Sequence, residues 1–101
     1  MIIYERMIQE IYPDKWAELE LLDQKYNMVE ARLGYPAKKR SRSISGKYNL
    51  NTLIIERQWE SMTKMEAANE LAQADPEYQA LWMEGTSIIK SVHWELYMPM
   101  P

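Results

Sequence analysis

Residues 13–36 read PDKWAELELLDQKYNMVEARLGYP, and this stretch decides how the rest of the chain is arranged. Large apolar residues recur in it at steps of three and four, which is the spacing of one face of an α-helix. They are Trp16, Leu19, Leu22, Tyr26, Val29 and Leu33. Pro13 suits the first turn of a helix and Asp14 its positive end, while Gly34 and Pro36 are typical of a C-terminal stop. We therefore predict one amphipathic helix that starts at Pro13 and ends before Gly34.

Three segments outside this helix have the composition of β-strands: residues 1–12, 51–59 and 88–98. The first of them alternates, with Ile3, Met7 and Ile11 on one face and Tyr4, Ile8 and Tyr12 on the other. The second holds three consecutive aliphatic residues, and the third alternates large apolar residues with polar ones. Because these strands carry apolar residues on both faces, we expect both faces of their sheet to be covered at least partly.

Residues 38–45 predict a polar strand that carries the main basic cluster of the chain. The segment 46–51 has the composition of a turn and would join this strand to residues 51–59 as a hairpin. The cluster consists of Lys38, Lys39, Arg40 and Arg42. At a sheet edge such charges prevent stray pairing with other sheets, and binding of an anionic substrate or a phosphate is the alternative role.

A second helical region follows the hairpin. Ser61 can cap a helix, and Asp75 and Pro76 end that helix and start a short one that Gly85 closes. The side of the longer helix that we expect to be buried carries Met62, Met65, Ala68 and Ala72. Strand, helix, strand, strand, helix, strand is the ferredoxin-like order.

This order predicts a single α+β domain, residues 1–101, with a four-stranded antiparallel sheet and its helices on one face. The other face would expose several large apolar side chains, which monomers rarely do. Pairing of that face with a second copy about a two-fold axis would cover it. We therefore expect a homodimer.

The composition excludes several classes of function. The net charge of −3 provides no field for nucleic acid, and the absence of cysteine excludes disulfides, thiolate metal sites and cysteine nucleophiles. Three glycines cannot form a dinucleotide-binding or phosphate-binding loop. With neither a signal peptide nor a long apolar run in view, we expect a cytoplasmic protein that does not interact with membranes.

The chain also resembles a known family. The opening Ile3-Tyr4-Glu5-Arg6, the segment Tyr12-Pro13-Asp14-Lys15, the helix over 16–33 and the closing Trp94-Glu95-Leu96-Tyr97 are similar to the NIPSNAP family. This resemblance implies a dimeric α/β barrel, in which two protomers pair sheet to sheet. The superfamily includes cofactor-free monooxygenases, haem-degrading enzymes and isomerases, with pockets between sheet and helices. The resemblance implies no catalytic residues, and the absence of histidine from the second helical region counts against haem degradation.

Candidate site residues are few. His93, the only histidine, is a candidate general base, although a core or half-exposed histidine with one hydrogen bond explains it equally simply. A zinc site would need more nitrogen or sulfur ligands, so we expect no metal and no cofactor. Candidates for lining a ligand pocket are Arg6, Arg57, Trp59, Trp82 and Tyr97. The two arginines need partners, for which Glu56, Glu95 or a bound carboxylate would serve. The aromatic residues could equally fill the core.

These features leave three hypotheses. The first is a NIPSNAP-like homodimer that binds a small apolar or aromatic molecule between sheet and helices. The second is a cofactor-free monooxygenase or isomerase that uses His93 in an aromatic pocket. The third is an interaction protein whose dimer is the functional unit. A cavity on which polar groups converge would separate the first two from the third.

Overall fold

The computed structural model describes all residues from 1 to 101 and contains four strands and three helices. In chain order they are β1 (Ile3–Ile11), α1 (Trp16–Leu33), β2 (Lys38–Arg42), β3 (Thr52–Trp59), α2 (Met62–Ala74), α3 (Pro76–Gly85) and β4 (Ile89–Tyr97). The predicted order is confirmed, with the second helical region divided into α2 and α3 at Asp75.

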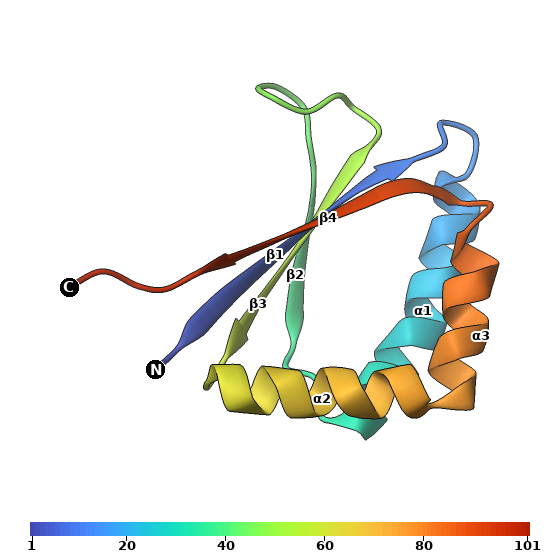
Figure 1. Cartoon of the computed structure of the whole chain (residues 1–101). Helices are drawn as coiled ribbons and strands as arrows, with labels where there is room; N and C mark the ends of the chain where they lie inside the picture. Colours follow the sequence, from blue (N-terminus) through green and yellow to red (C-terminus); the bar gives the residue numbers. More distant parts are fainter.

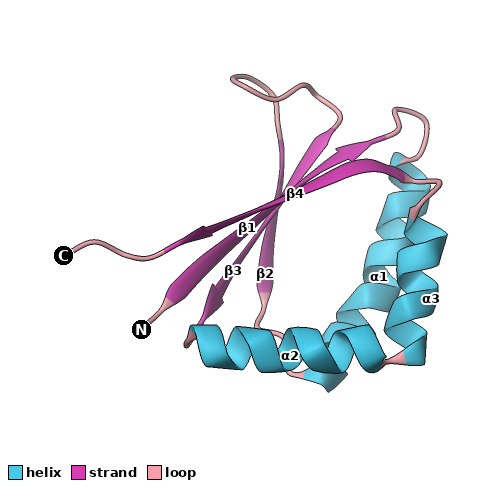
Figure 2. Ribbon diagram, viewed as in Figure 1, coloured by secondary structure: helices cyan, strands magenta, loops and turns pink.

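The strands form one antiparallel sheet in the order β2-β3-β1-β4. All three helices lie on the same side of it, and β2 occupies an edge as predicted (Figure 1). Figure 2 shows α1 and α3 side by side, with α2 running from the end of β3 to the foot of α3. No helix is both long enough and apolar enough to cross a membrane.

The helix ends follow local chemistry with one correction. α1 begins at Trp16, not at Pro13, because residues 13–14 form a turn that the Lys15 N–H closes by donating to the Tyr12 carbonyl at 2.9 Å. Gly34 ends α1 with φ 85°, a left-handed conformation that glycine adopts without strain. Ser61 accepts from the Lys64 N–H and caps α2, as predicted.

Two apolar clusters hold the helices on the sheet. The larger lies where α1 and α3 meet the upper part of the sheet and contains Ile11, Leu19, Leu22, Val29, Leu53, Ile55, Leu81 and Ile88. The smaller lies under α2 and contains Ile3, Trp59, Met65 and Ala68. Met62, predicted to be buried with Met65, is 40% exposed because the first turn of α2 overhangs the sheet only in part.

Two strand predictions also need correction. The strand predicted over 38–45 ends at Arg42, and Ile44 lies in the following loop with 86% of its surface exposed. The last strand, predicted over 88–98, spans Ile89–Tyr97. Beyond the strand ends single backbone hydrogen bonds continue, from the Ser43 N–H to the Thr52 carbonyl at 3.1 Å and from the Tyr12 N–H to the Ile88 carbonyl at 3.0 Å, but the regular pairing stops.

The face of the sheet that points away from the helices is covered by no element, and we call it the open face (Figure 2). The strand alternation assigns to it Tyr4, Arg6, Ile8, Lys39, Ile54, Glu56, His93, Glu95 and Tyr97. Ile8 lies between Ile54 and His93 in the register and forms the apolar centre of this face. The open face is therefore mixed in character, with charged residues around two isoleucines.

Candidate functional site

A cleft of about 820 Å³ lies between the helix-facing side of the sheet and the three helices. The cleft is lined by 24 residues, of which 15 are hydrophobic. Nearly all of the hydrophobic ones come from β1, β3, β4 and the three helices. Four residues of the larger apolar cluster, Leu19, Leu22, Leu53 and Ile55, form part of the lining.

Two tryptophans, one from each wall, lie at the edge of this cleft. Trp82 of α3 and Trp94 of β4 stack with ring centroids 6.1 Å apart and planes at 13°. They remain 44% and 48% exposed, although stacking has already covered one face of each ring. Exposed stacked indoles offer aromatic surface to a flat ligand.

An ion-pair network stands along the α1 side of the cleft. Glu30 of α1 accepts from Arg57 Nη2 at 2.7 Å and from Lys38 Nζ at 3.0 Å, and Lys38 also contacts Asp23 at 2.6 Å. The four side chains are between 3% and 13% exposed. Charges this well buried are stable because each cation meets a carboxylate, so the network joins β2 and β3 to α1.

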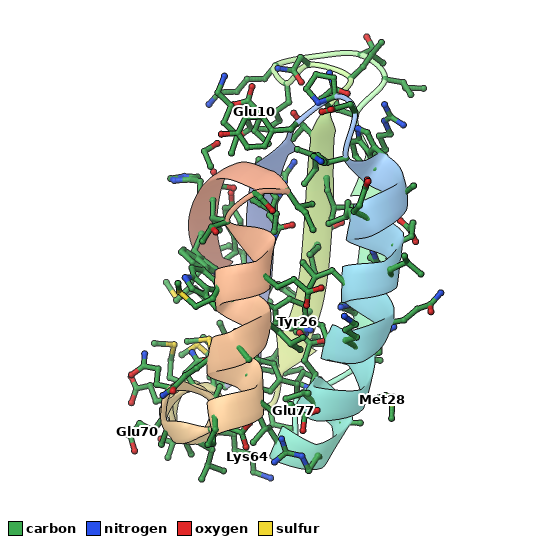
Figure 3. All side chains as sticks on the ribbon, turned by 90° about the vertical axis from the view of Figure 1, so that its right-hand side faces the viewer. Glu10, Tyr26, Met28, Lys64, Glu70 and Glu77 are labelled. Carbon is green, nitrogen blue, oxygen red and sulfur yellow. The ribbon has the colours of Figure 1, made fainter.

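Three tyrosines complete the polar lining. The Tyr35 hydroxyl donates to Asn69 Oδ1 at 2.7 Å, and the rings of Tyr26 and Tyr35 lie 5.6 and 6.5 Å from that of Tyr78. Figure 3 shows Tyr26 between α1 and α3. Burial raises the pKa of all three phenols above the ordinary value, so they are protonated hydrogen-bond donors at neutral pH.

The floor of the cleft contributes two polar residues of β1. Glu5 and Gln9 are each 8% exposed and lie on either side of Met7 on the helix-facing side. The Trp59 indole N–H donates to Glu5 Oε1 at 2.8 Å. The Gln9 side-chain amide makes one hydrogen bond, from its nitrogen to the Met7 sulfur, which is a weak acceptor.

The candidates from the sequence fall into two groups. Arg57 and Trp82 line the cleft, and Trp59 stands behind its wall, where it orients Glu5. His93, Arg6 and Tyr97 lie on the open face, across the sheet from the cleft. The His93 side chain is 68% exposed and lies 3.5 Å from Glu95. Nowhere do three or more His, Cys, Asp or Glu side chains come together in an arrangement that could hold a metal ion.

The open-face residues have their own short network. Tyr97 donates to Glu95, and this hydrogen bond lowers the pKa of Glu95 and raises that of Tyr97. Arg6 lies opposite Glu95 on one side and Glu56 on the other in the strand register, whereas Arg57 pairs with Glu30 and with neither Glu56 nor Glu95. The buried Nε of Arg6 has no hydrogen-bond partner.

The basic cluster serves mainly to join β2 to α1. Lys38 pairs with Asp23 and Glu30, and Arg40 pairs with Glu20 at 2.7 Å. The Arg42 guanidinium stacks 3.9 Å from the centroid of the Trp16 ring. Lys39 alone points to the open face. Three of the four basic side chains are therefore engaged within the protein.

Sequence reasoning missed Glu5, Asp23, Glu30, Tyr35 and Tyr78 as cleft residues. A signal was available for two of them, because Asp23 and Glu30 are seven residues apart and so lie on one face of α1, beside the apolar stripe. Whether Glu5, Tyr35 and Tyr78 line the cleft depends on how the helices pack on the sheet, and no local sequence pattern records that packing.

Comparison with known proteins places this fold. No family model and no curated protein matches the sequence. Among solved structures, a NIPSNAP family protein from Agrobacterium tumefaciens is similar with a TM-score of 0.83 at 20% identity, covering 99% of this chain and 94% of that one. An uncharacterized NIPSNAP-like domain protein from Burkholderia xenovorans gives 0.80 at 16%, covering 98% and 85%.

A second Agrobacterium tumefaciens protein, described as of the NIPSNAP family with unknown function, gives 0.79 at 15% identity, covering 97% of this chain and 87% of that one. At these identities the likeness shows the fold, which is NIPSNAP-like over the full length. The resemblance seen in the sequence is thus confirmed at the level of structure.

Proposed function

We propose that this chain is a cytoplasmic NIPSNAP-like homodimer that binds a small apolar or aromatic molecule in the cleft between sheet and helices. The observation that carries the proposal is the cleft itself. Its volume of about 820 Å³ lies within the roughly 300–1,000 Å³ typical of small-molecule sites. Its lining combines a hydrophobic majority with a few placed polar groups, which is the usual composition of such sites.

The shape of the cleft favours a flat ligand. Trp82 and Trp94 offer ring faces at the entrance, and the tyrosines offer hydroxyl donors farther in. A ligand that stacks on the indoles and reaches the phenols would use both features.

The open face supports the dimer. Ile8 and Ile54 lie at its centre and are surrounded by charges of both signs, Arg6 and Lys39 against Glu56 and Glu95. A two-fold axis brings each patch against its own copy, so a face that carries both signs can pair with itself. The family resemblance implies the same sheet-to-sheet pairing.

The enzymatic alternative, a cofactor-free monooxygenase or isomerase that uses His93, obtains less support from the geometry. His93 lies across the sheet from the cleft and is largely exposed, so it makes no contact with a molecule bound between sheet and helices. In the dimer proposed above, His93 would belong to the interface.

The binding of N-phenyl-1-naphthylamine, a dye that is uncharged at neutral pH and brightens in apolar surroundings, tests the cleft. We expect saturable binding, weakened about tenfold by Gln73→Trp, which places an indole in the cleft lining. Glu70→Trp is the matched control, because Glu70 points outward from the same helix (Figure 3). Equal binding by both variants, or no saturable binding by the native chain, would overturn the proposal.

Native mass spectrometry of the protein purified from cells tests the dimer and the ligand together. A dimer that carries an additional few hundred daltons supports both parts of the proposal. A monomer at tens of micromolar contradicts the pairing, whatever it carries.

A further inference from the structure

The charged residues that line the cleft do not balance. Three of them are carboxylates, Glu5, Asp23 and Glu30, and two are cations, Lys38 and Arg57. Arg40, which does not line the cleft, also contacts Asp23 through its Nε at 3.5 Å, so the question is which lining carboxylate has no cation at all. A carboxylate that is largely buried and has no cation is more costly than one on the surface, so its location matters.

Both cations are committed to the carboxylates of α1. Lys38 Nζ lies 2.6 Å from Asp23 and 3.0 Å from Glu30, and Arg57 Nη2 lies 2.7 Å from Glu30. Arg57 is the direct partner of Glu5 in the β1–β3 register, yet its side chain turns towards α1. The carboxylate without a cation is therefore that of Glu5.

Glu5 is held in place without being neutralised. It is 8% exposed, and its Oε1 accepts the Trp59 indole N–H at 2.8 Å. Trp59 is itself 3% exposed and stacks edge-on against Tyr35 at 5.2 Å, so this donor is rigid. Glu5 Oε2 makes no hydrogen bond or ion pair within the protein, and Glu5 is part of the cleft lining. The floor thus presents an oriented carboxylate oxygen to whatever occupies the cleft.

Apolar surface adjoins this carboxylate. Leu96 lies opposite Glu5 on β4, and Trp94 lies opposite Met7. Trp94 stacks in turn on Trp82. A molecule on this floor would meet a negative oxygen at one point and aliphatic and indole surface next to it.

We propose that the ligand of the cleft is an amine that carries an aromatic ring system, with its protonated nitrogen on Glu5 and its ring against Trp94. The inference rests on the proposed binding function and names its chemical class. The ammonium group provides the charge that the lining lacks and an N–H for Glu5 Oε2, and the ring covers the apolar surface beside it. An anionic ligand would find no free cation in the lining, because Lys38 and Arg57 already pair with carboxylates.

Three probes that share one ring separate charge from aromatic contact: 1-naphthylmethylamine, 1-naphthylmethanol and 1-naphthoate. Their affinities are measured at pH 7 by displacement of N-phenyl-1-naphthylamine from the native chain. We expect the amine to bind about tenfold or more tightly than the alcohol, and the carboxylate most weakly.

Glu5→Gln assigns the preference to this residue, because glutamine keeps the size of the side chain and an oxygen for Trp59 but removes the charge. We expect the variant to bind the amine no more tightly than the alcohol, with the affinity of the alcohol within about threefold of the native value. Glu70→Gln makes the same change of charge on the outer side of α2 and should leave all three affinities unaltered (Figure 3).

The outcomes distinguish this inference from the function on which it rests. If the native chain binds amine and alcohol equally, the amine assignment is wrong while the cleft still binds aromatic molecules. If no probe displaces the dye, both are wrong. Should Glu5→Gln fail to fold, the NMR chemical shift of the Trp59 indole N–H in the native chain, followed as each probe is added, tests the inference instead. The amine should shift it strongly and the alcohol weakly, and equal shifts would overturn the inference.

Discussion

The two faces of the sheet differ in the burial of their polar residues. On the helix-facing side, Glu5, Gln9 and Arg57 are at least nine-tenths buried, and each has a neighbour that fixes its direction. On the open face, Glu56 and His93 are exposed and their side chains are free to solvent. Both faces come from the same strands by simple alternation. The strand pattern sets which face a residue takes but not its burial, since Ile8 on the open face is 6% exposed and Trp94 on the helix-facing side is 48% exposed.

Two strand arginines illustrate the contrast. Arg57 pairs with Glu30 of α1 and lies 5.0 Å from the Tyr35 ring centroid, so tertiary partners surround it. Arg6 lies between Glu56 and Glu95 in the register on the open face, and its buried Nε has no acceptor. Arg57 therefore has its partners within the chain, whereas Arg6 Nε has none.

The largest expected effect concerns the ion-pair network of the helix-facing side. Glu30→Gln removes the carboxylate that Arg57 and Lys38 share and leaves buried charge uncompensated. We expect the free energy of unfolding to fall by about 3 kcal/mol. Glu56→Gln on the open face should change it by less than about 0.5 kcal/mol. Urea denaturation at one fixed protein concentration measures both, and equal losses would remove the distinction between the faces.

The next effect concerns the dimer proposed for the open face. Ile54→Glu places a charge at the centre of that face, where the protomer alone leaves residue 54 partly accessible. We expect the dimer dissociation constant to rise about 100-fold, because the pairing would bury the new charge. Light scattering after size-exclusion chromatography measures it. Leu71→Glu, on the exposed side of α2, is the control, and a similar rise there would show that the open face is not the interface.

A smaller effect is expected at the entrance of the cleft. Trp82→Ala removes one of the two stacked indoles and should weaken N-phenyl-1-naphthylamine binding about tenfold, since aromatic contacts contribute about 1 kcal/mol each. Trp82 is 44% exposed, so the fold should persist, which circular dichroism checks. Tyr97→Ala removes an aromatic ring from the open face and should leave dye binding as it was. Loss of binding in both variants would indicate a site other than the cleft.

The smallest effect concerns Asp75, at the corner between α2 and α3. A hydrogen bond from Arg32, and a second from the Tyr78 N–H, lower the pKa of Asp75 from 3.8 to about 2. Because the folded value lies below the unfolded one, this stabilisation is present above pH 4 and is lost as the pH falls through about 2. Asp75→Asn should lower the melting temperature by roughly 5 °C at pH 7.

The difference between Asp75→Asn and the native chain should shrink as the pH falls towards 2. Glu77→Gln is the control, because Glu77 lies 3.7 Å from the same arginine and is 63% exposed. If the difference stays constant across this pH range, the Arg32 pair is not its cause.

Much of the fold was predictable because its signals are local. The apolar spacing from Trp16 to Leu33, the Ser61 cap and the Asp75-Pro76 break lie within a few residues of what they determine. The start of α1 was placed too early because Pro13 suits a turn as well as the first turn of a helix. The site was less predictable, since Arg57 and Trp82 were expected to line it while Glu5 and Tyr78 were not.

By itself the sequence determined the elements, their order and the face of the sheet that each strand residue takes, because periodicity and capping act over a few residues. Only the tertiary structure decided that Arg57 turns to Glu30 and that Glu5 remains without a cation in a cleft. These pairings join residues 27 and 54 positions apart, Arg57 to Glu30 and Glu5 to Trp59. Such contacts form only when the helices pack on the sheet, so no local pattern of residues records them.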